Sequence, residues 1–138
     1  MSYTFLKCLV FNARSICANL TDFYHVLNSG EFDIILVTET WLKEAIPNSP
    51  VDPSHKYNVL RYDRPSSPGG GVCIVLKKCF SFTEITIDDS VEVLAIDVII
   101  QRDKYRFVVV YRPPAYDEAG KLYAAELAGT LTSLSRVK

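Results

Sequence analysis

Long apolar runs separated by short polar interruptions predict a protein rich in β-strands. Residues 34–37 are four consecutive aliphatic side chains. Such a run without alternation is typical of a strand that is buried on both faces, as in α/β proteins. The remaining apolar runs predict further strands at residues 4–11, 57–62, 72–76, 80–87, 91–100 and 105–110, with a charged hairpin tip at residues 101–104.

Two stretches have the spacing of amphipathic helices. The first begins at Asn19, a favourable N-cap with Asp22 three residues later, and ends at Gly30. The second begins near Asp117. Their apolar stripes are Leu20, Phe23, Tyr24 and Leu27 in the first helix, and Leu127, Leu131 and Leu134 in the second. The first helix therefore joins two parallel strands through a right-handed β-α-β crossover, and both strands end at the same edge of the sheet.

Composition narrows the class of protein. The 138 residues form one domain at most, and 49% hydrophobic against 22% charged residues predicts a packed core. A net charge of −1 provides no overall basic field, so DNA binding requires a local patch. No apolar run reaches the ~18 residues of a membrane span, and the first twelve residues do not resemble a signal peptide.

The cysteines and histidines do not form a recognisable metal motif. No Cys-x-x-Cys pair occurs, and we expect reduced thiols in or near the core of an intracellular protein, nuclear or cytoplasmic, in preference to a zinc site or disulfides. We assign structural or surface roles to His25 and His55. The cysteines are Cys8, Cys17, Cys73 and Cys79.

Three polar side chains follow predicted strands directly. Asn12, Glu39 and Tyr111 supply an amide, a carboxylate and a hydroxyl, which are the groups that a Mg²⁺-dependent phosphodiester site needs. The alternative is that Asn12 caps a turn, Glu39 is solvated and Tyr111 packs by its ring. Residues 69–71, three glycines, are either a phosphate cradle or, more simply, a hairpin turn, because no P-loop pattern follows them. We expect residues 41–42 to pack the loop after Glu39 onto the body of the protein.

Four blocks carry a resemblance to a known family. They are Phe11–Ile16, Asp33–Leu42, Arg64 with Gly69–Val72, and Val110–Pro114. In this order and spacing they resemble the endonuclease/exonuclease/phosphatase superfamily and, more narrowly, the apurinic/apyrimidinic-type endonuclease domain of non-LTR retrotransposons. The resemblance runs from about Leu6 to Pro114.

The resemblance implies an α/β fold, the DNase I-like four-layer sandwich, of which residues 4–138 form a partial domain holding the N-terminal half to two-thirds. It implies Mg²⁺-dependent hydrolysis of DNA phosphodiester bonds, here nicking that primes reverse transcription. Glu39 is the implied Mg²⁺ ligand, Asn12 the amide that orients catalytic carboxylates, and Tyr111 the donor to the scissile phosphate. Arg14 departs from relatives that carry a carboxylate two residues after the asparagine.

The family's later Gly-Asp-x-Asn and Ser-Asp-His blocks do not occur in this chain. We therefore expect a truncated domain that is inactive alone, binds Mg²⁺ weakly and leaves the inner face of its first sheet uncovered. One alternative is a non-catalytic half-domain that binds a protein partner, or itself, through that face. Another is a phosphoesterase of the same superfamily with a different substrate, such as an inositol phosphate.

Overall fold

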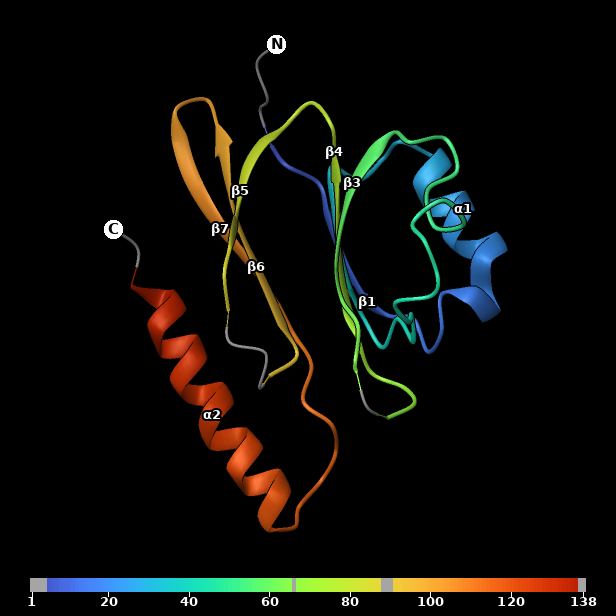
Figure 1. The fold of residues 1–138 in the computed structure, drawn as a ribbon. Coiled ribbons are helices and arrows are strands. Elements are labelled where there is room, and N and C mark those ends of the chain that lie inside the picture. Colours follow the sequence, from blue (N-terminus) through green and yellow to red (C-terminus); the bar gives the residue numbers. More distant parts are fainter. Residues whose placement is uncertain (1–4, 66, 88–90, 137–138) are drawn as a thin grey trace.

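The computed structural model describes residues 5–65, 67–87 and 91–136, and it shows four layers of secondary structure (Figure 1). A helix, two sheets and a second helix follow one another across the molecule. This arrangement confirms the predicted four-layer α/β sandwich. The elements are β1 (Cys8–Asn12), η1 (Cys17–Asn19), α1 (Leu20–Asn28), β2 (Ile34–Thr38), β3 (Tyr57–Tyr62), β4 (Val72–Lys77), β5 (Ser81–Ile85), β6 (Val93–Ile100), β7 (Asp103–Val110) and α2 (Glu118–Ser135).

The first sheet has the strand order β1-β2-β4-β3. β1 and β2 are parallel neighbours joined through α1, as the crossover rule predicts, and β4 runs antiparallel to both β2 and β3. On the α1 side, Phe23 and Leu27 of the helix pack against Ile35 and Val37 of β2. The aliphatic run of β2 is therefore buried on both faces, as expected.

The second sheet, in the order β5-β6-β7, covers the inner face of the first. We predicted that this inner face would be uncovered, and for most of the sheet that prediction is wrong. The strands after residue 80 are long enough to form a covering sheet of their own, and α2 packs on its outer face. The inner core is formed by Ile34, Leu36, Leu60, Val72, Ile74, Leu76, Phe80, Leu94, Ile96, Val98 and Val109.

Only the margin of the first sheet extends beyond this cover. β7 lies against β2 and β4, so β1 is placed one strand outside it. Val10 is in register with the inner-face residue Leu36, yet its side chain is 65% exposed. Cys8 on the same face is exposed as well. Among the strands of the described residues, the uncovered inner surface is therefore confined to β1.

Several local predictions differ from the structure. The first strand begins at Cys8 instead of residue 4, which lies outside the described residues. Asn19 does not cap α1 with its side chain, because its amide donates to the carbonyls of Ala13 and Ser15. The 101–104 hairpin tip is shorter than predicted, because Ile100 already pairs with Asp103.

None of the four cysteines, all within the described residues, is in a disulfide, but only Cys73 lies in the core. The prediction of core or near-core positions is wrong for the other three, which are exposed. Cys8 lies on the uncovered margin, Cys17 in η1 and Cys79 in the turn before β5. Both histidines are exposed, in agreement with surface roles. Across the described residues, neither helix is both long and apolar enough to cross a bilayer.

Candidate active site

Glu39 and Tyr111 meet where the two sheets face each other. Glu39 directly follows β2 of the first sheet, and Tyr111 directly follows β7 of the second. The Tyr111 hydroxyl donates a hydrogen bond to Glu39 Oε1 at 2.9 Å, and both residues are half-buried. Two strand-end residues that are 72 positions apart in the sequence thus form one polar pair.

Asn12 is the last residue of β1 and is in register with Thr38, the residue before Glu39, so Asn12 and Glu39 lie at the same edge of the first sheet, as the crossover rule predicts. Tyr111 reaches this edge from the second sheet, and not from the same sheet. The side chain of Asn12 is exposed, and its Oδ1 accepts a hydrogen bond from the backbone N–H of Arg14 at 3.2 Å. This bond is the turn cap that we considered as the simpler interpretation, and it leaves the amide N–H₂ group as the donor available to a ligand.

The backbone at the site is held in an unusual conformation. Glu39 has φ +51° and Trp41 has φ +56°, in the left-handed region that residues with a Cβ rarely adopt. The Glu39 carbonyl accepts a hydrogen bond from Ser15 N–H at 3.0 Å. The backbone N–H groups of Thr40 and Trp41 donate to the loop before β4, on the side opposite β1. Hydrogen bonds on both sides therefore hold this conformation.

Two of the three glycines, Gly70 and Gly71, supply that second support. All three lie in the loop that connects β3 to β4, which favours the hairpin interpretation over a phosphate cradle. The Gly71 carbonyl accepts from Thr40 N–H at 3.2 Å, and the Gly70 carbonyl accepts from Trp41 N–H at 2.9 Å. Their carbonyls, which would repel a phosphate, therefore point at the segment that carries Glu39.

Two residues join this turn to Tyr111: Arg64, which sequence reasoning had placed in the Gly-rich block without a role, and Glu92, which it did not identify. Arg64 donates from Nη2 to Glu92 Oε2 at 2.9 Å, and its guanidinium lies 6.0 Å from the centre of the Tyr111 ring. Glu92 precedes β6, and its carbonyl accepts from Tyr111 N–H at 3.0 Å. The sequence did contain a signal for Glu92. It is the one glutamate in the apolar run 91–100, and a buried carboxylate requires a bonding partner elsewhere in the fold.

The surroundings keep both Tyr111 and Arg64 protonated. Burial raises the pKa of the Tyr111 phenol, the hydrogen bond to Glu39 raises it further, and Arg64 acts in the opposite direction. The hydrogen bond to Glu92 raises the pKa of the Arg64 guanidinium. Tyr111 is therefore a hydrogen-bond donor at neutral pH, and Arg64 is a permanent cation beside it.

The donor set fits one magnesium ion shared with a phosphate. Glu39 offers a single carboxylate, and Mg²⁺ is usually held by one or two carboxylates together with substrate phosphates. Over residues 5–65, 67–87 and 91–136, no group of three or more His, Cys, Asp and Glu side chains is placed to hold a metal. That part of the chain therefore contains no closed, all-protein metal cage.

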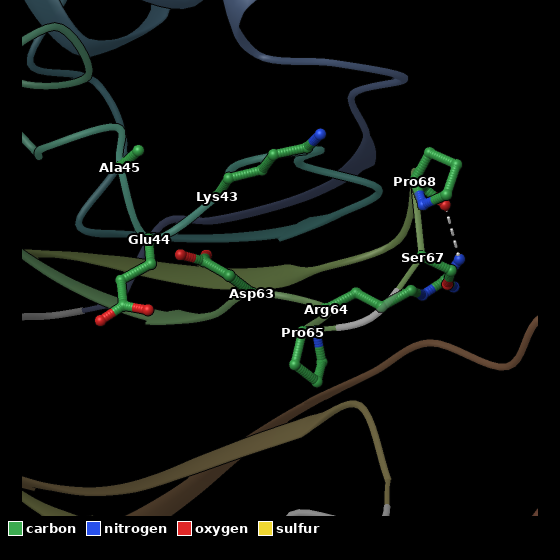
Figure 2. A pocket seen from close by; sticks show the side chains of 8 residues that line it. All are labelled: Lys43, Glu44, Ala45, Asp63, Arg64, Pro65, Ser67 and Pro68. Atoms are coloured by element: carbon green, nitrogen blue, oxygen red, sulfur yellow. Dashed lines mark hydrogen bonds between the residues drawn. The ribbon is translucent and has the colours of Figure 1, made fainter.

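A surface pocket of about 760 Å³ lies next to Arg64, and Figure 2 shows it between the loop at residues 43–45 and the loop at residues 63–68. Arg64 donates to the Pro68 carbonyl along one wall. Lys43 and Arg64 line the pocket together with Glu44 and Asp63. Two cations facing two anions do not form the basic patch that DNA binding requires.

Comparisons with solved structures place the fold. No protein-family model and no curated protein matches the chain. A 3′ phosphatase, NExo, from Neisseria, solved with a product DNA hairpin, has a TM-score of 0.69 and 19% identity over 96% of this chain and 52% of its own. An AP endonuclease from Archaeoglobus fulgidus has a TM-score of 0.67 and 19% identity, covering 97% of this chain and 53% of that one.

The endonuclease domain of TRAS1, a telomere-specific non-LTR retrotransposon, matches with a TM-score of 0.64 and 10% identity over 89% of this chain and 53% of that chain. At these identities the similarity establishes the fold. This chain spans about half the length of the structures that it matches. It has the DNase I-like α/β fold of these structures, over about half of their length.

Proposed function

We propose that the chain carries part of a Mg²⁺-dependent phosphodiester hydrolase site that acts on DNA, of the kind found in retrotransposon endonucleases. The observation that carries this proposal is the 2.9 Å hydrogen bond between the Tyr111 hydroxyl and the Glu39 carboxylate. It joins the implied metal ligand to the implied phosphate donor across two sheets. The matched proteins include a 3′ phosphatase bound to DNA and AP endonucleases, which supports a phosphodiester substrate.

Each residue has a distinct role in the proposal. Glu39 holds Mg²⁺, which, when bound, neutralises the charge that develops on the phosphate oxygens. Tyr111 is kept neutral by its surroundings, and its single O–H, which donates to Glu39 Oε1 in this structure, would turn to a non-bridging phosphate oxygen when Glu39 holds Mg²⁺. Asn12 donates from its side-chain amide to orient a carboxylate or phosphate oxygen, since its carbonyl oxygen is already bound to Arg14 N–H.

We propose that the described residues provide no positioned base for the attacking water, and we expect the chain to be inactive alone. His25 lies on α1 and His55 in the loop before β3, and both are exposed to solvent. A positioned general base is typically worth ~10²–10⁴-fold in rate. We expect no nicking of supercoiled plasmid above background with Mg²⁺, and equal results for the chain and Glu39→Ala. Strong nicking that disappears in Glu39→Ala would show that the chain is active by itself.

Substrate binding tests the site independently of turnover. A short DNA duplex with Mg²⁺ should shift the NMR signals of Asn12, Glu39 and Tyr111, and Glu39→Ala should abolish the Mg²⁺ dependence. Glu44→Ala removes an exposed carboxylate five residues away and should leave that dependence unchanged. DNA-induced shifts that avoid these three residues would contradict the proposed site.

Metal affinity is the second measurable consequence. Mg²⁺ demands an octahedral shell, and one carboxylate leaves most of that shell to water, so we expect weak binding without substrate. Isothermal titration calorimetry should find no tight site. A dissociation constant in the low micromolar range that is lost in Glu39→Ala would mean that the chain supplies ligands beyond Glu39.

The structure does not favour the alternative of a binding half-domain that uses an exposed sheet face. The inner face of β2, β4 and β3 is buried under β5-β6-β7, so the surface invoked for a partner is reduced to β1.

An intracellular origin in a mobile element is the setting that we propose for a DNA-nicking domain. A reading frame for a reverse transcriptase in the downstream genomic DNA would test that origin.

A further inference from the structure

Glu92 binds both the Gly-rich turn, which supports the Glu39 segment, and the strand end that carries Tyr111. Its side chain is only 7% exposed, and Oε1 accepts from Gly71 N–H at 2.7 Å. The same carboxylate takes two hydrogen bonds from Arg64, at 3.3 Å from Nε and 2.9 Å from Nη2. A buried carboxylate with three donors is fully compensated, so it is a rigid point in the structure.

One series of hydrogen bonds connects the Glu92 side chain to the segment that carries Glu39. Glu92 fixes Gly71 through its N–H, and the carbonyl of Gly71 accepts from Thr40 N–H. The neighbouring Gly70 carbonyl accepts from Trp41 N–H. The backbone on both sides of Thr40 has positive φ and depends on such external bonds.

A second series of hydrogen bonds connects the Glu92 backbone to Tyr111. The backbone carbonyl of Glu92 accepts from Tyr111 N–H at 3.0 Å, and its N–H donates to the Tyr123 hydroxyl at 2.7 Å. That hydroxyl donates in turn to the Tyr111 carbonyl at 3.0 Å. The Arg64 guanidinium adds a cation–π contact with the Tyr111 ring at 6.0 Å.

The geometry points to the Arg64–Glu92 ion pair as the positioning device of the site, because it ties the Gly-rich turn of the first sheet to the Tyr111 strand end of the second. Glu92 touches neither Glu39 nor the proposed substrate and acts through the residues that it holds. Gly70 is part of the same device, since a Cβ there would lie 2.4 Å from the Arg64 guanidinium. This inference rests on the proposed function of Glu39 and Tyr111.

A matched ion pair elsewhere in the fold provides the control. Arg106 and Asp97 form a second bidentate pair, at 2.7 and 2.8 Å, on the β6–β7 hairpin. The side chains of both pairs are mostly buried, with at most 20% exposed. Arg106 also donates to the Leu134 carbonyl of α2, on the outer face of the sheet and away from Glu39. Glu92→Gln and Asp97→Asn therefore each replace the carboxylate of a bidentate ion pair by a neutral amide. The first change lies beside the site and the second lies away from it.

The first measurement is residue-resolved amide exchange by NMR. In Glu92→Gln, we expect the amides of Thr40 and Trp41 to exchange about tenfold faster relative to the core amides of β4, because the turn that binds them loses its anchor. Asp97→Asn should leave this ratio unchanged. A uniform increase at all amides in Glu92→Gln, or an unchanged ratio, would overturn the inference. Arg64→Lys, which retains the charge without the bidentate fork, should reproduce the local effect and is the second variant if Glu92→Gln does not fold.

The second measurement is Mn²⁺-induced broadening of the Glu39 amide signal. The Mn²⁺ concentration for half-maximal broadening should rise at least about threefold in Glu92→Gln and stay unchanged in Asp97→Asn, because a loosened backbone holds the carboxylate less well. If the Mn²⁺ concentration for half-maximal broadening is unchanged in Glu92→Gln, the ion pair stabilises the fold but does not position Glu39. If Glu39→Ala broadens as the wild type does, the metal assignment fails instead, and the exchange experiment alone then decides the positioning role.

Discussion

Substituting Gly71 with alanine tests how tightly the Glu39 segment is packed against the Gly-rich turn. Gly71 has φ +87°, and a Cβ added there would lie 2.5 Å from Thr40 Oγ1. Real Cβ atoms do not approach so closely, and Thr40 is 1% exposed with no free space to enter. The substitution must therefore move either the turn or the Thr40 side chain.

Two contributions set the expected loss of stability. A left-handed conformation costs a residue with a Cβ about 1–2 kcal/mol. Displacing the Thr40 hydroxyl also breaks its hydrogen bond from Leu42 N–H, at 3.3 Å in a buried position, and an unsatisfied buried group costs about 1–3 kcal/mol. We expect Gly71→Ala to lower the free energy of unfolding by about 2–5 kcal/mol, the sum of these terms.

Urea denaturation followed by tryptophan fluorescence is the appropriate assay. Trp41 is the only tryptophan in the chain, and its indole nitrogen lies 3.7 Å from the position of a Cβ on Gly69. With an m-value of about 2 kcal/mol per molar urea, a loss of about 3 kcal/mol lowers the midpoint by about 1.5 M. The fluorescence thus reports on the same turn that the substitution perturbs.

Gly30→Ala provides the matched control. Gly30 has φ +65°, and a Cβ there would meet no atom within 4 Å, so only the conformational cost applies, about 1–2 kcal/mol. The difference between the two variants measures the contact with Thr40. Equal losses in Gly71→Ala and Gly30→Ala would refute the close packing of the turn against the Glu39 segment. The double variant Thr40→Ala/Gly71→Ala should recover part of the loss, because it removes the clashing hydroxyl.

Two further predictions follow from the ionisable groups. The hydrogen bonds from Arg106 lower the pKa of Asp97, so its stabilisation is present above the ordinary aspartate pKa of about 4 and is lost as the pH falls through the lowered value. Asp97→Asn should therefore lower the urea midpoint at pH 7, and a difference from wild type that does not shrink below about pH 4 would contradict this. Burial raises the pKa of the Cys73 thiol to about 12. Iodoacetamide at pH 8 should alkylate the fully buried Cys73 much more slowly than exposed Cys17, as peptide mapping can show, and comparable rates would indicate a more open core.

The strands and helices were predictable where periodicity and burial agree. The run at residues 34–37 and the stripe of α1 depend on local pattern, which is why both were identified. The cap of α1 was not, because Asn19 makes tertiary hydrogen bonds to Ala13 and Ser15 that no local rule contains. The cover of the inner face was also missed, since the pairing of β6 with β7 on top of the first sheet is a long-range property.

The site was predictable to the extent that strand ends determine it. Asn12 and Glu39 lie together because parallel strands joined by a crossover end at one edge, which is a rule of topology. Their catalytic roles remain predictions. Glu92 and Tyr123 escaped sequence reasoning, because their partners are 28 and 31 positions away in the chain and local patterns do not report such pairs.

The placement of Glu39 and Tyr111 on different sheets makes the site sensitive to motion between the two sheets. Their hydrogen bond spans the interface between two layers that are joined by apolar side chains such as Leu36 and Ile96 and, near the site, by the bonds of Glu92 to Arg64 and Gly71. Apolar contacts are non-directional, whereas these few polar bonds constrain how the two sheets align. A substitution deep in that interface would thus change the alignment of the two polar groups without touching either one. If the second sheet detached while the first stayed folded, the site would disappear although every strand that carries Asn12 and Glu39 remained intact.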